Sequence, residues 1–402
     1  MNWKKRLGWL SLSLFVGGLL ASCSHPSEPT TEKPVSSDYI VAAYIWPSCH
    51  DDSLAHTYLW DQGEGEWEII KKGTPRFEGH YQPKQPLWGY EPDNDPQVVE
   101  RWIHTALAHG VNTFVYDWYW FKNGPYLESA LNDGFLKAPS NQQMNFYIMW
   151  ANHTVVYNYW NCHKYGDDRS VLFDPKVDWD NFKKVVNRVI TQYFKQPNYL
   201  KFEGCPVMAI FDYKQLVDSF GSIEETRKAL DYFREKAKEA GFPGIHFQMN
   251  PGGGYFLNAD NTKQLKELFD GLGVNSVAFY NMGSFSTDYL VHCADAVEIR
   301  KQWDEAFDIP IFPTVSIGWD DTPRFPAKGA NDVTRYHNTP TSFATYLAVA
   351  KAFVDTHPDQ PKMMMINAWN EWVEGSYLLP DHLNGFGYLE AVRDVMQGKY
   401  DK

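Results

Sequence analysis

The sequence predicts a fold of the α/β class, a single (β/α)8 TIM barrel with long loops at its C-terminal face. Two observations lead to this prediction. Short apolar runs recur along the chain, and longer amphipathic patterns with a helical period separate them. Most of the runs are nearly continuous in hydrophobicity, as expected of parallel strands that are covered on both faces. A doubly wound open sheet is the alternative, although no GxGxxG motif follows the first run.

Eight apolar runs follow one another along the chain. They occupy residues 39–46, 113–120, 145–152, 206–213, 244–250, 276–282, 311–319 and 362–372. Helices are predicted between them over residues 96–109, 178–194, 223–240 and 341–356. Gly110 and Gly241 directly follow two of these segments, at the position where glycine commonly ends a helix. Eight strands with helices between them are the pattern of the barrel.

The composition narrows the class of partner. The 402 residues carry 37 Lys+Arg against 50 Asp+Glu, a net charge of −13, so we expect no nucleic-acid partner, because phosphate binding needs a basic surplus. Aromatic residues make up 16% of the chain. Flat aromatic rings suit the apolar faces of sugars, although an aromatic-rich core would give the same composition. Composition alone leaves these two interpretations open.

The N-terminus predicts export. Residues 4–6 are basic, and residues 7–21 are apolar but too short to span a bilayer comfortably. The following Ser22-Cys23 completes a sequence that resembles the lipobox of bacterial lipoproteins. We therefore expect a signal peptide over 1–22, lipidation of Cys23, a flexible tether over 23–38 and a catalytic barrel over 39–402. The expected location is the bacterial cell envelope, with membrane attachment through the lipid anchor only. An ordinary secretory signal with a chance cysteine is the alternative.

Sequence motifs for cofactors are missing. The chain contains no HExxH, no EF-hand loop and no P-loop, and its later cysteines show no CxxC spacing. We therefore expect no metal site and no cofactor, and we expect a monomer. Pairing among Cys49, Cys162, Cys205 and Cys293 cannot be read from the sequence, so disulfides and free thiols both remain open.

Polar and aromatic residues stand at the C-terminal end of every predicted strand. In a (β/α)8 barrel these ends carry the active site. The three tryptophans among them could stack on sugar rings, and the other residues could bind sugar hydroxyls. For each residue, packing or a structural hydrogen bond is the alternative. The candidates for substrate binding are Asp117, Trp118, Trp150, Asn152, His153, Asp212, Asn250, Tyr280, Trp319 and Asn370.

The last strand ends in two glutamates, Glu371 and Glu374. Hydrolysis of a glycosidic bond needs two carboxyl groups in different protonation states. In an extended strand, residues three apart face opposite sides, so the pair needs a turn after Glu371. Gly375 permits such a turn. We predict that both glutamates are catalytic; one catalytic glutamate with a partner in a rim salt bridge is the alternative.

The segment 367–375, Asn-Ala-Trp-Asn-Glu-Trp-Val-Glu-Gly, resembles the NEW-x-EG signature of the glycoside hydrolase family 99-like proteins. These include the WbsX-type proteins, described as lipopolysaccharide glycosyltransferases, and they are relatives of the endo-α-mannosidases. The resemblance extends from residue 39 to about residue 388. Other segments that carry it are 88–90, 95–96, 115–121, 149–152, 193–211 and 318–324.

This resemblance implies a retaining glycoside hydrolase that cleaves an α-linked, mannoside-like oligosaccharide or polysaccharide. Glu371 would take the proton of the substrate's 2-hydroxyl, giving a 1,2-anhydro sugar, and Glu374 would be the general acid and base. His153 and Leu379 depart from the family pattern, which leaves the identity of the sugar open. The alternatives are a WbsX-type glycosyltransferase and a non-catalytic glycan-binding lipoprotein.

Overall fold

The computed structural model describes residues 34–35, 38–121, 124–251 and 255–401. The predicted signal peptide, Cys23 and most of the predicted tether lie outside the described residues. All described residues belong to one compact unit, residues 32–402.

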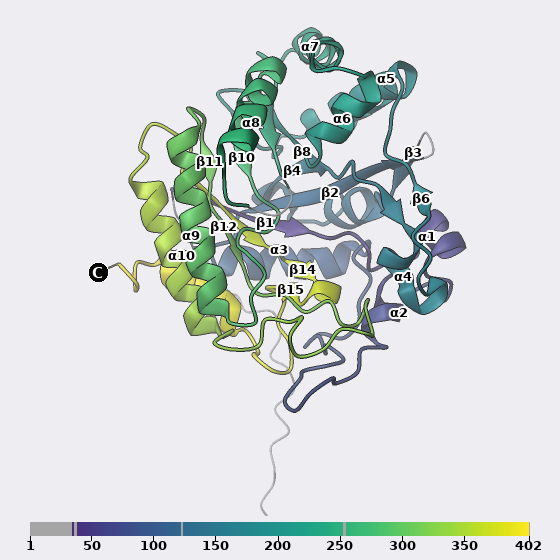
Figure 1. The fold of residues 1–402 in the computed structure, drawn as a ribbon, viewed down its shortest axis with the longest axis vertical. Coiled ribbons are helices and arrows are strands. Elements are labelled where there is room, and N and C mark those ends of the chain that lie inside the picture. Colours follow the sequence, from purple (N-terminus) through teal and green to yellow (C-terminus); the bar gives the residue numbers. More distant parts are fainter. Residues whose placement is uncertain (1–33, 36–37, 122–123, 252–254, 402) are drawn as a thin grey trace, which may run out of the picture. The chain divides into compact units, whose positions relative to one another are not determined.

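Parallel strands form the centre of this unit, with helices around them (Figure 1). The hydrogen-bonded order is β11-β10-β9-β8-β4-β2-β1-β13-β12, and all neighbours along this path are parallel. The predicted (β/α)8 barrel is confirmed. The strands span β1 Ile40–Ile45, β2 Thr113–Phe121, β4 Asn145–Trp150, β8 Cys205–Ile210, β9 His246–Met249, β10 Ser276–Ala278, β11 Ile311–Phe312, β12 Thr314–Ser316 and β13 Met363–Asn367.

Pro313 explains why the path begins and ends with two short strands. β11 and β12 are one run of chain that changes partner at this residue. Before it, Ile311 pairs with Val277 of β10; after it, Thr314 pairs with Met365 of β13. Proline has no N–H and cannot continue a ladder as a donor, but its carbonyl accepts a hydrogen bond of 2.8 Å from the Met365 N–H. The split strand therefore joins the two ends of the path and completes the ring.

Helices connect most of the strands. The four predicted helices are present, although the second ends in a π-helical segment, Val189–Phe194. In the described part of the connection between β2 and β4, the helical segments are short. They are the π-helical segment Ala130–Phe135 and the 3-10 turn Asn141–Gln143. The barrel helices are α3 Pro96–Ala108, α5 Trp179–Arg188, α7 Ile223–Glu239, α8 Ala259–Leu272, α9 Tyr289–Ala306, α10 Pro340–Asp355 and α11 Gly387–Met396.

Long loops with short elements follow several strands at their C-terminal ends, as predicted. The helices in these loops are α1 Ser53–Tyr58, α2 Trp67–Ile70, α4 Tyr157–Tyr165 and α6 Tyr213–Phe220. The additional strands of the chain are β3 Gly124–Tyr126, β5 Val155–Val156, β6 Val171–Phe173, β7 Lys201–Phe202, β14 Asn370–Glu371 and β15 Ser376–Tyr377. Within the described residues, no helix combines the length and apolarity needed to cross a bilayer. The four described cysteines are free thiols.

Several polar side chains inside the barrel are hydrogen-bonded to one another or to the backbone. The Tyr147 hydroxyl donates to Gln248 Oε1 at 3.0 Å, and the Tyr44 hydroxyl donates to the Phe279 carbonyl at 3.0 Å. A buried polar group that lacks a partner costs stability, whereas a paired one constrains the packing around it. These bonds join strands that are not neighbours in the ring, β4 with β9 and β1 with the end of β10.

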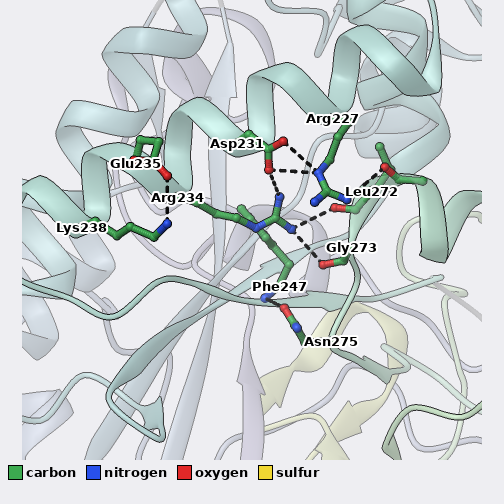
Figure 2. A network of polar contacts seen from close by, with 10 residues as sticks. Arg227, Asp231, Arg234, Glu235, Lys238, Phe247, Leu272, Gly273 and Asn275 are labelled. Carbon is green, nitrogen blue, oxygen red and sulfur yellow. Dashed lines mark hydrogen bonds and ion pairs between the residues drawn. The ribbon is translucent and has the colours of Figure 1, made fainter.

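Arg234 of α7 links that helix to the end of α8 (Figure 2). Its Nη2 donates to the carbonyls of Leu272 and Gly273, both at 2.9 Å, and Asp231 accepts from its Nη1 at 2.7 Å. The guanidinium also lies over the Phe247 ring, 4.8 Å from its centroid. Carbonyls at a helix end have no intrahelical partner, and a cation there also interacts favourably with the helix dipole.

We predict that Arg234→Ala lowers the free energy of unfolding by about 1–3 kcal/mol, because two carbonyls lose their donor. Urea unfolding followed by circular dichroism measures this change. Lys238→Ala on the same helix is the matched control: Lys238 pairs with Glu235 at the surface, and its removal should change stability by less than about 0.5 kcal/mol. Equal losses in the two variants would contradict the capping role of Arg234.

Candidate active site

A cavity of about 850 Å³ lies at the C-terminal ends of the barrel strands. Its lining residues come from the ends of β1, β2, β4, β8, β10, β12 and β13 and from the loops that follow them. They include Trp46, Asp117, Tyr119, His153, Tyr159, Trp160, Phe211, Tyr280, Phe285, Trp319, Asp321, Arg324, Glu371 and Glu374.

Glu371 and Glu374 both line this cavity because the chain turns between them. Glu371 ends β14, and residues Trp372–Glu374 form one turn of 3-10 helix. Gly375 ends the turn with a φ of +67°, in the region that favours glycine. A Cβ on Gly375 would lie 2.9 Å from the Cβ of Asp320, so the turn has no room for a side chain there. The turn predicted from the sequence is present.

The Arg324 guanidinium lies within 4 Å of the carboxyl groups of both glutamates. Its Nη1 donates to Glu374 Oε1 at 3.1 Å, and its Nη2 lies 3.9 Å from Glu371 Oε1. The other oxygen of Glu371, Oε2, accepts a hydrogen bond of 2.6 Å from the Tyr280 hydroxyl. The two carboxyl groups therefore share one cation, while only Glu371 has a tyrosine donor.

A third glutamate, Glu66, pairs with the same cation. Its Oε1 accepts from Arg324 Nη2 at 2.9 Å. Its Oε2 accepts from Trp46 Nε1 at 2.5 Å and from Ser48 Oγ at 3.0 Å. Glu66 is fully buried, and both of its carboxylate oxygens accept hydrogen bonds from neighbouring side chains.

Burial controls the protonation of these acids. It raises the pKa of Glu374 to about 7, although Arg324 opposes this change. Burial and the neighbouring Glu374 raise the pKa of Glu371 well above its usual value, and they do the same for Asp117. Because the acids outnumber the cation, the cluster holds protons at neutral pH, and Glu371 and Glu374 titrate as a coupled pair.

Four predicted binding residues line the cavity together with the glutamates: Asp117, His153, Tyr280 and Trp319. Asp117 is buried, and within the described part of the chain its Oδ1 has no hydrogen-bond partner. Burial lowers the pKa of His153, so its imidazole is neutral over a wide pH range. Of the two departures from the family pattern, only His153 lies at the cavity; Leu379 is buried away from it.

The prediction that Trp118 and Trp150 stack on a sugar is wrong. Both are buried outside the cavity, with exposed fractions of 2% and 1%. Trp118 Nε1 donates to Glu128 Oε1 at 2.8 Å, and the Trp150 ring stacks on Phe182 of α5. Side chains alternate across a strand, and because Asp117 faces into the barrel, Trp118 faces the helices.

Asn152 and Asp212 form a structural link between two strand ends, and their predicted role in substrate binding stays a prediction. Asn152 Nδ2 donates to the Asp212 carbonyl at 2.7 Å, and Asn152 Oδ1 accepts from the Asp212 N–H at 2.9 Å. The Asp212 carboxylate accepts from the Gln215 N–H and caps α6. These bonds join the ends of β4 and β8, and neither side chain lines the cavity.

Asn250 and Asn370 also have structural roles. Asn250 Nδ2 donates to the Tyr44 hydroxyl, and its Oδ1 accepts from the Tyr280 N–H, each at 2.8 Å. Asn370 bonds both the N–H and the carbonyl of Trp46, each at 2.8 Å. Neither asparagine lines the cavity, so the predicted contact with sugar hydroxyls is wrong for both. They position Tyr280 and Trp46, which do line it.

The aromatic wall of the cavity was not predicted from the sequence. The Tyr119 ring packs edge-on against the rings of Trp160 and His153, with centroid distances of 5.8 Å and 5.7 Å. The centroids of the His153 and Phe211 rings are 5.4 Å apart. Tyr119 stands two residues after Asp117 on β2, so strand alternation could have identified it. Glu66 carries no comparable signal, because it lies in a long loop far from the glutamate pair in the sequence.

Asp320 connects the long loop after β1 to the turn that carries Glu374. Its Oδ2 accepts from His80, Gln82 and Lys84 at 2.8–3.0 Å. Its N–H donates to the Glu374 carbonyl at 2.6 Å. Burial opposes ionisation of Asp320, but the charge of Lys84 and the hydrogen bonds of its other donors hold its pKa well below the usual range.

Among the described residues, no group of three or more His, Cys, Asp and Glu side chains is arranged to hold a metal ion. The arrangement at the mouth therefore consists of acids that share one guanidinium, a tyrosine donor and an aromatic wall. Acids with raised pKa values near neutrality can give and take protons on a bound substrate.

Comparison with protein families and curated sequences gave two results. The model of the family described as glycosyltransferase WbsX matches residues 41–392. Two curated proteins, both described as uncharacterized protein WxcX and both from Xanthomonas campestris pv. campestris, are 24% identical over 384 residues. The alignments cover 94% of this chain and 52% of each relative, so the chain spans about half the length of the curated relatives it matches.

Comparison with solved structures shows the same fold in glycoside hydrolases. A GH99 endo-alpha-mannosidase from Bacteroides thetaiotaomicron is 12% identical with a TM-score of 0.55, covering 90% of this chain and 97% of that one. A structure described as a glycoside hydrolase-like protein is 13% identical with a TM-score of 0.57, covering 92% and 97%. At these identities the likeness shows a shared fold.

Proposed function

Because the chain belongs to the WbsX family and has a GH99-like glycoside hydrolase fold, we propose that it is a glycoside hydrolase that cleaves an α-linked, mannoside-like glycan with retention of configuration. One observation carries the proposal. Glu371 and Glu374 line one buried cavity at the mouth of the barrel and differ in their partners. Glycosidic hydrolysis needs such a pair of non-equivalent carboxyl groups.

Glu374 is the general acid and base of this proposal. A pKa of about 7 suits a group that must hold a proton for the leaving oxygen and later accept one from water. Arg324 donates to only one of its two oxygens, and among the described residues no other group donates a hydrogen bond to this side chain. Within the described residues, its second oxygen is therefore available for the substrate.

Glu371 is the base toward the 2-hydroxyl. As Glu371 takes that proton, the 2-oxygen bonds to the anomeric carbon, and the leaving oxygen departs with the proton of Glu374. Water then attacks the anomeric carbon and gives a proton to Glu374, while the 2-oxygen takes its proton back from Glu371. The raised pKa of Glu371 helps here, because a stronger base holds a hydroxyl proton better.

The lining of the cavity supports a carbohydrate substrate. Its volume of about 850 Å³ lies within the range of small-molecule sites and exceeds the needs of one sugar ring. Tyr119, Trp160 and Phe211 offer aromatic faces, and Asp117 offers a buried carboxyl group for hydroxyl recognition. His153 stands at a position where the family pattern differs, so the sugar could differ from mannose.

A WbsX-type glycosyltransferase is the second candidate, because the family carries that description. Such enzymes often bind a sugar diphosphate through a DxD motif and a metal ion. The DxD-like stretches before barrel helices are Asp93-Asn94-Asp95 and Asp178-Trp179-Asp180, and Asp178 caps α5. Asp93 bonds the Cys49 N–H and His50, and Asp95 caps α3, so both carboxylates already have structural partners.

Calorimetry with nucleoside diphosphate sugars separates the two candidates. A hydrolase should give no saturable heat with these donors and should release reducing sugar from a glycan. Saturable donor binding that is accompanied by sugar transfer, and not by hydrolysis, would replace our proposal with the transferase.

We also propose that the protein is exported and held at the cell envelope through lipidated Cys23, a residue outside the described part of the chain. The motivating observation is the lipobox-like sequence before it. Membrane fractionation tests this proposal: Cys23→Ser should move the protein from the membrane fraction to the soluble fraction, and unchanged fractionation would contradict it.

We predict that Glu374→Gln and Glu371→Gln each lower kcat/KM on a natural glycan by about 10²–10⁴-fold, the usual effect of removing an acid or base. The loss in Glu374→Gln should be smaller on a substrate with an activated leaving group, because departure then needs less protonation. Product analysis by NMR also gives the anomeric configuration. Glu68→Gln, another buried glutamate outside the cavity, is the matched control. Full turnover by either cavity variant would refute its assigned role.

The pH dependence of kcat/KM gives a second prediction. Glu374 must be protonated and Glu371 must be ionised for the reaction, so the profile should be bell-shaped. Activity should fall as the pH rises through about 7, where Glu374 loses its proton, and should also fall on the acid side, where Glu371 gains one. Initial rates from pH 4.5 to 9 on one glycan measure both limbs. A rate that stays constant up to pH 9 would exclude Glu374 as an acid with this pKa.

A further inference from the structure

Glu66 is a buried carboxylate that the hydrolysis itself does not use. It stands in the long loop between β1 and α3, at the N-terminal end of α2. Its N–H donates to the Ser48 carbonyl at 2.8 Å. The preceding Gly65 has a φ of +61°, and a Cβ there would lie 2.1 Å from that same carbonyl. The loop is therefore packed against the end of β1 too closely for any other residue at position 65.

This docking delivers the Glu66 side chain to Arg324. Trp46 and Ser48 donate to one oxygen, so the carboxylate cannot rotate without losing two hydrogen bonds. Its other oxygen accepts from Arg324 Nη2 at 2.9 Å, a shorter contact than that between Arg324 and Glu374. Arg324 is itself buried, with an exposed fraction of 3%.

The guanidinium divides its donors among the acids. Nη2 donates to Glu66 and lies 3.9 Å from Glu371, whereas Nη1 donates to Glu374. A guanidinium pairs most strongly with a carboxylate when two parallel N–H groups face it. Because Glu66 occupies Nη2, Glu374 receives a single bond from Arg324 and not the stronger bidentate pair.

We infer that Glu66 is a positioning residue for the pair of Glu371 and Glu374: it fixes the Arg324 guanidinium so that this one cation is shared and does not belong to Glu374. The inference rests on the proposed function, since it assigns Glu66 the task of keeping the acid protonated. Glu66 also contributes a negative charge of its own to the cluster.

Other titratable groups lie around Glu374, and the contact between Glu66 and Arg324 does not involve them. Asp321 acts electrostatically on Glu374 and pairs with Lys328 at 2.5 Å. Other groups that interact electrostatically with Glu374 or with Arg324 are Asp117, Tyr119, His153, Tyr159, Cys162 and Tyr280. Among the described residues, Arg324 is the cation in ion-pair distance of Glu66, Glu371 and Glu374 alike.

The test is Glu66→Gln in the full chain. Glutamine keeps the shape and an acceptor oxygen, but it removes the charge that holds Arg324. Arg324 then favours ionised Glu374, and the alkaline limb of kcat/KM should move to lower pH by about one unit. Above both alkaline limbs the variant should be about tenfold less active than the wild type, whereas on the acid side of both limbs the two should be nearly equal.

Glu68→Gln is the matched control, because Glu68 is a buried carboxylate of the same helix that accepts from the Gln62 N–H and does not contact Arg324. Its pH profile should match the wild type. If Glu66→Gln loses activity equally at all pH values, Glu66 has a direct or merely structural role, and the inference is wrong. An unshifted profile with full activity overturns it as well.

Glu66→Asp is the second variant in case glutamine prevents folding. It keeps the charge but is shorter by one methylene, so it cannot reach Arg324 and Trp46 together. The alkaline limb should move in the same direction by a smaller amount. A folded Glu66→Asp protein with the wild-type limb would contradict the inference.

A measurement without substrate separates this inference from the proposed function. The raised pKa of Glu374 means that its contribution to stability is complete below its ordinary value of 4.5 and is lost as the pH rises through about 7. In Glu66→Gln this loss should be smaller and should end at lower pH. Urea unfolding from pH 4.5 to 8 shows the difference even if no glycan is cleaved. Identical pH dependence in both proteins would overturn the inference alone.

Discussion

Arg324 faces three buried glutamates, and the mouth of the barrel is organised around this imbalance of charge. One guanidinium cannot neutralise Glu66, Glu371 and Glu374 together, so the cluster must hold protons that acids in water would release. A buried ion pair adds little net stability, because removing both charges from water is costly. What the arrangement supplies instead is a carboxyl group that keeps its proton near neutral pH.

The parts of this cluster come from distant places in the sequence. Glu66 belongs to the loop after β1, Arg324 to the loop after β12, and the glutamate pair to the turn after β13. β1 and β12 both pair with β13, so the closed ring makes these three loops neighbours. The barrel thus serves as a frame that brings together groups which no local segment could hold. Pro313 contributes to this closure, because it lets one strand pair on both of its sides in succession.

The sequence predicted the barrel because burial on both faces makes parallel strands continuously apolar, and this pattern is local. The turn after Glu371 was also predictable, because it depends on a single local residue, the glycine at position 375. The choice among aromatic residues failed at Trp118 and Trp150, because the parity of a strand decides which side chains face inward. Asn250 and Asn370 were misassigned because a polar residue at a strand end can bond the backbone as readily as a ligand. Glu66 could not be found, since its role depends on a contact with Arg324 across 258 residues.

The bonds from His80, Gln82 and Lys84 to Asp320 have a consequence for how related sequences can diverge. The backbone of Asp320 holds the carbonyl of Glu374, so the loop after β1 is mechanically coupled to the reacting groups. Insertions or deletions in that loop can therefore adjust the tilt of the Glu374 carboxyl group while every residue that lines the cavity stays the same. Selection can in this way change the acidity of the cavity from its periphery.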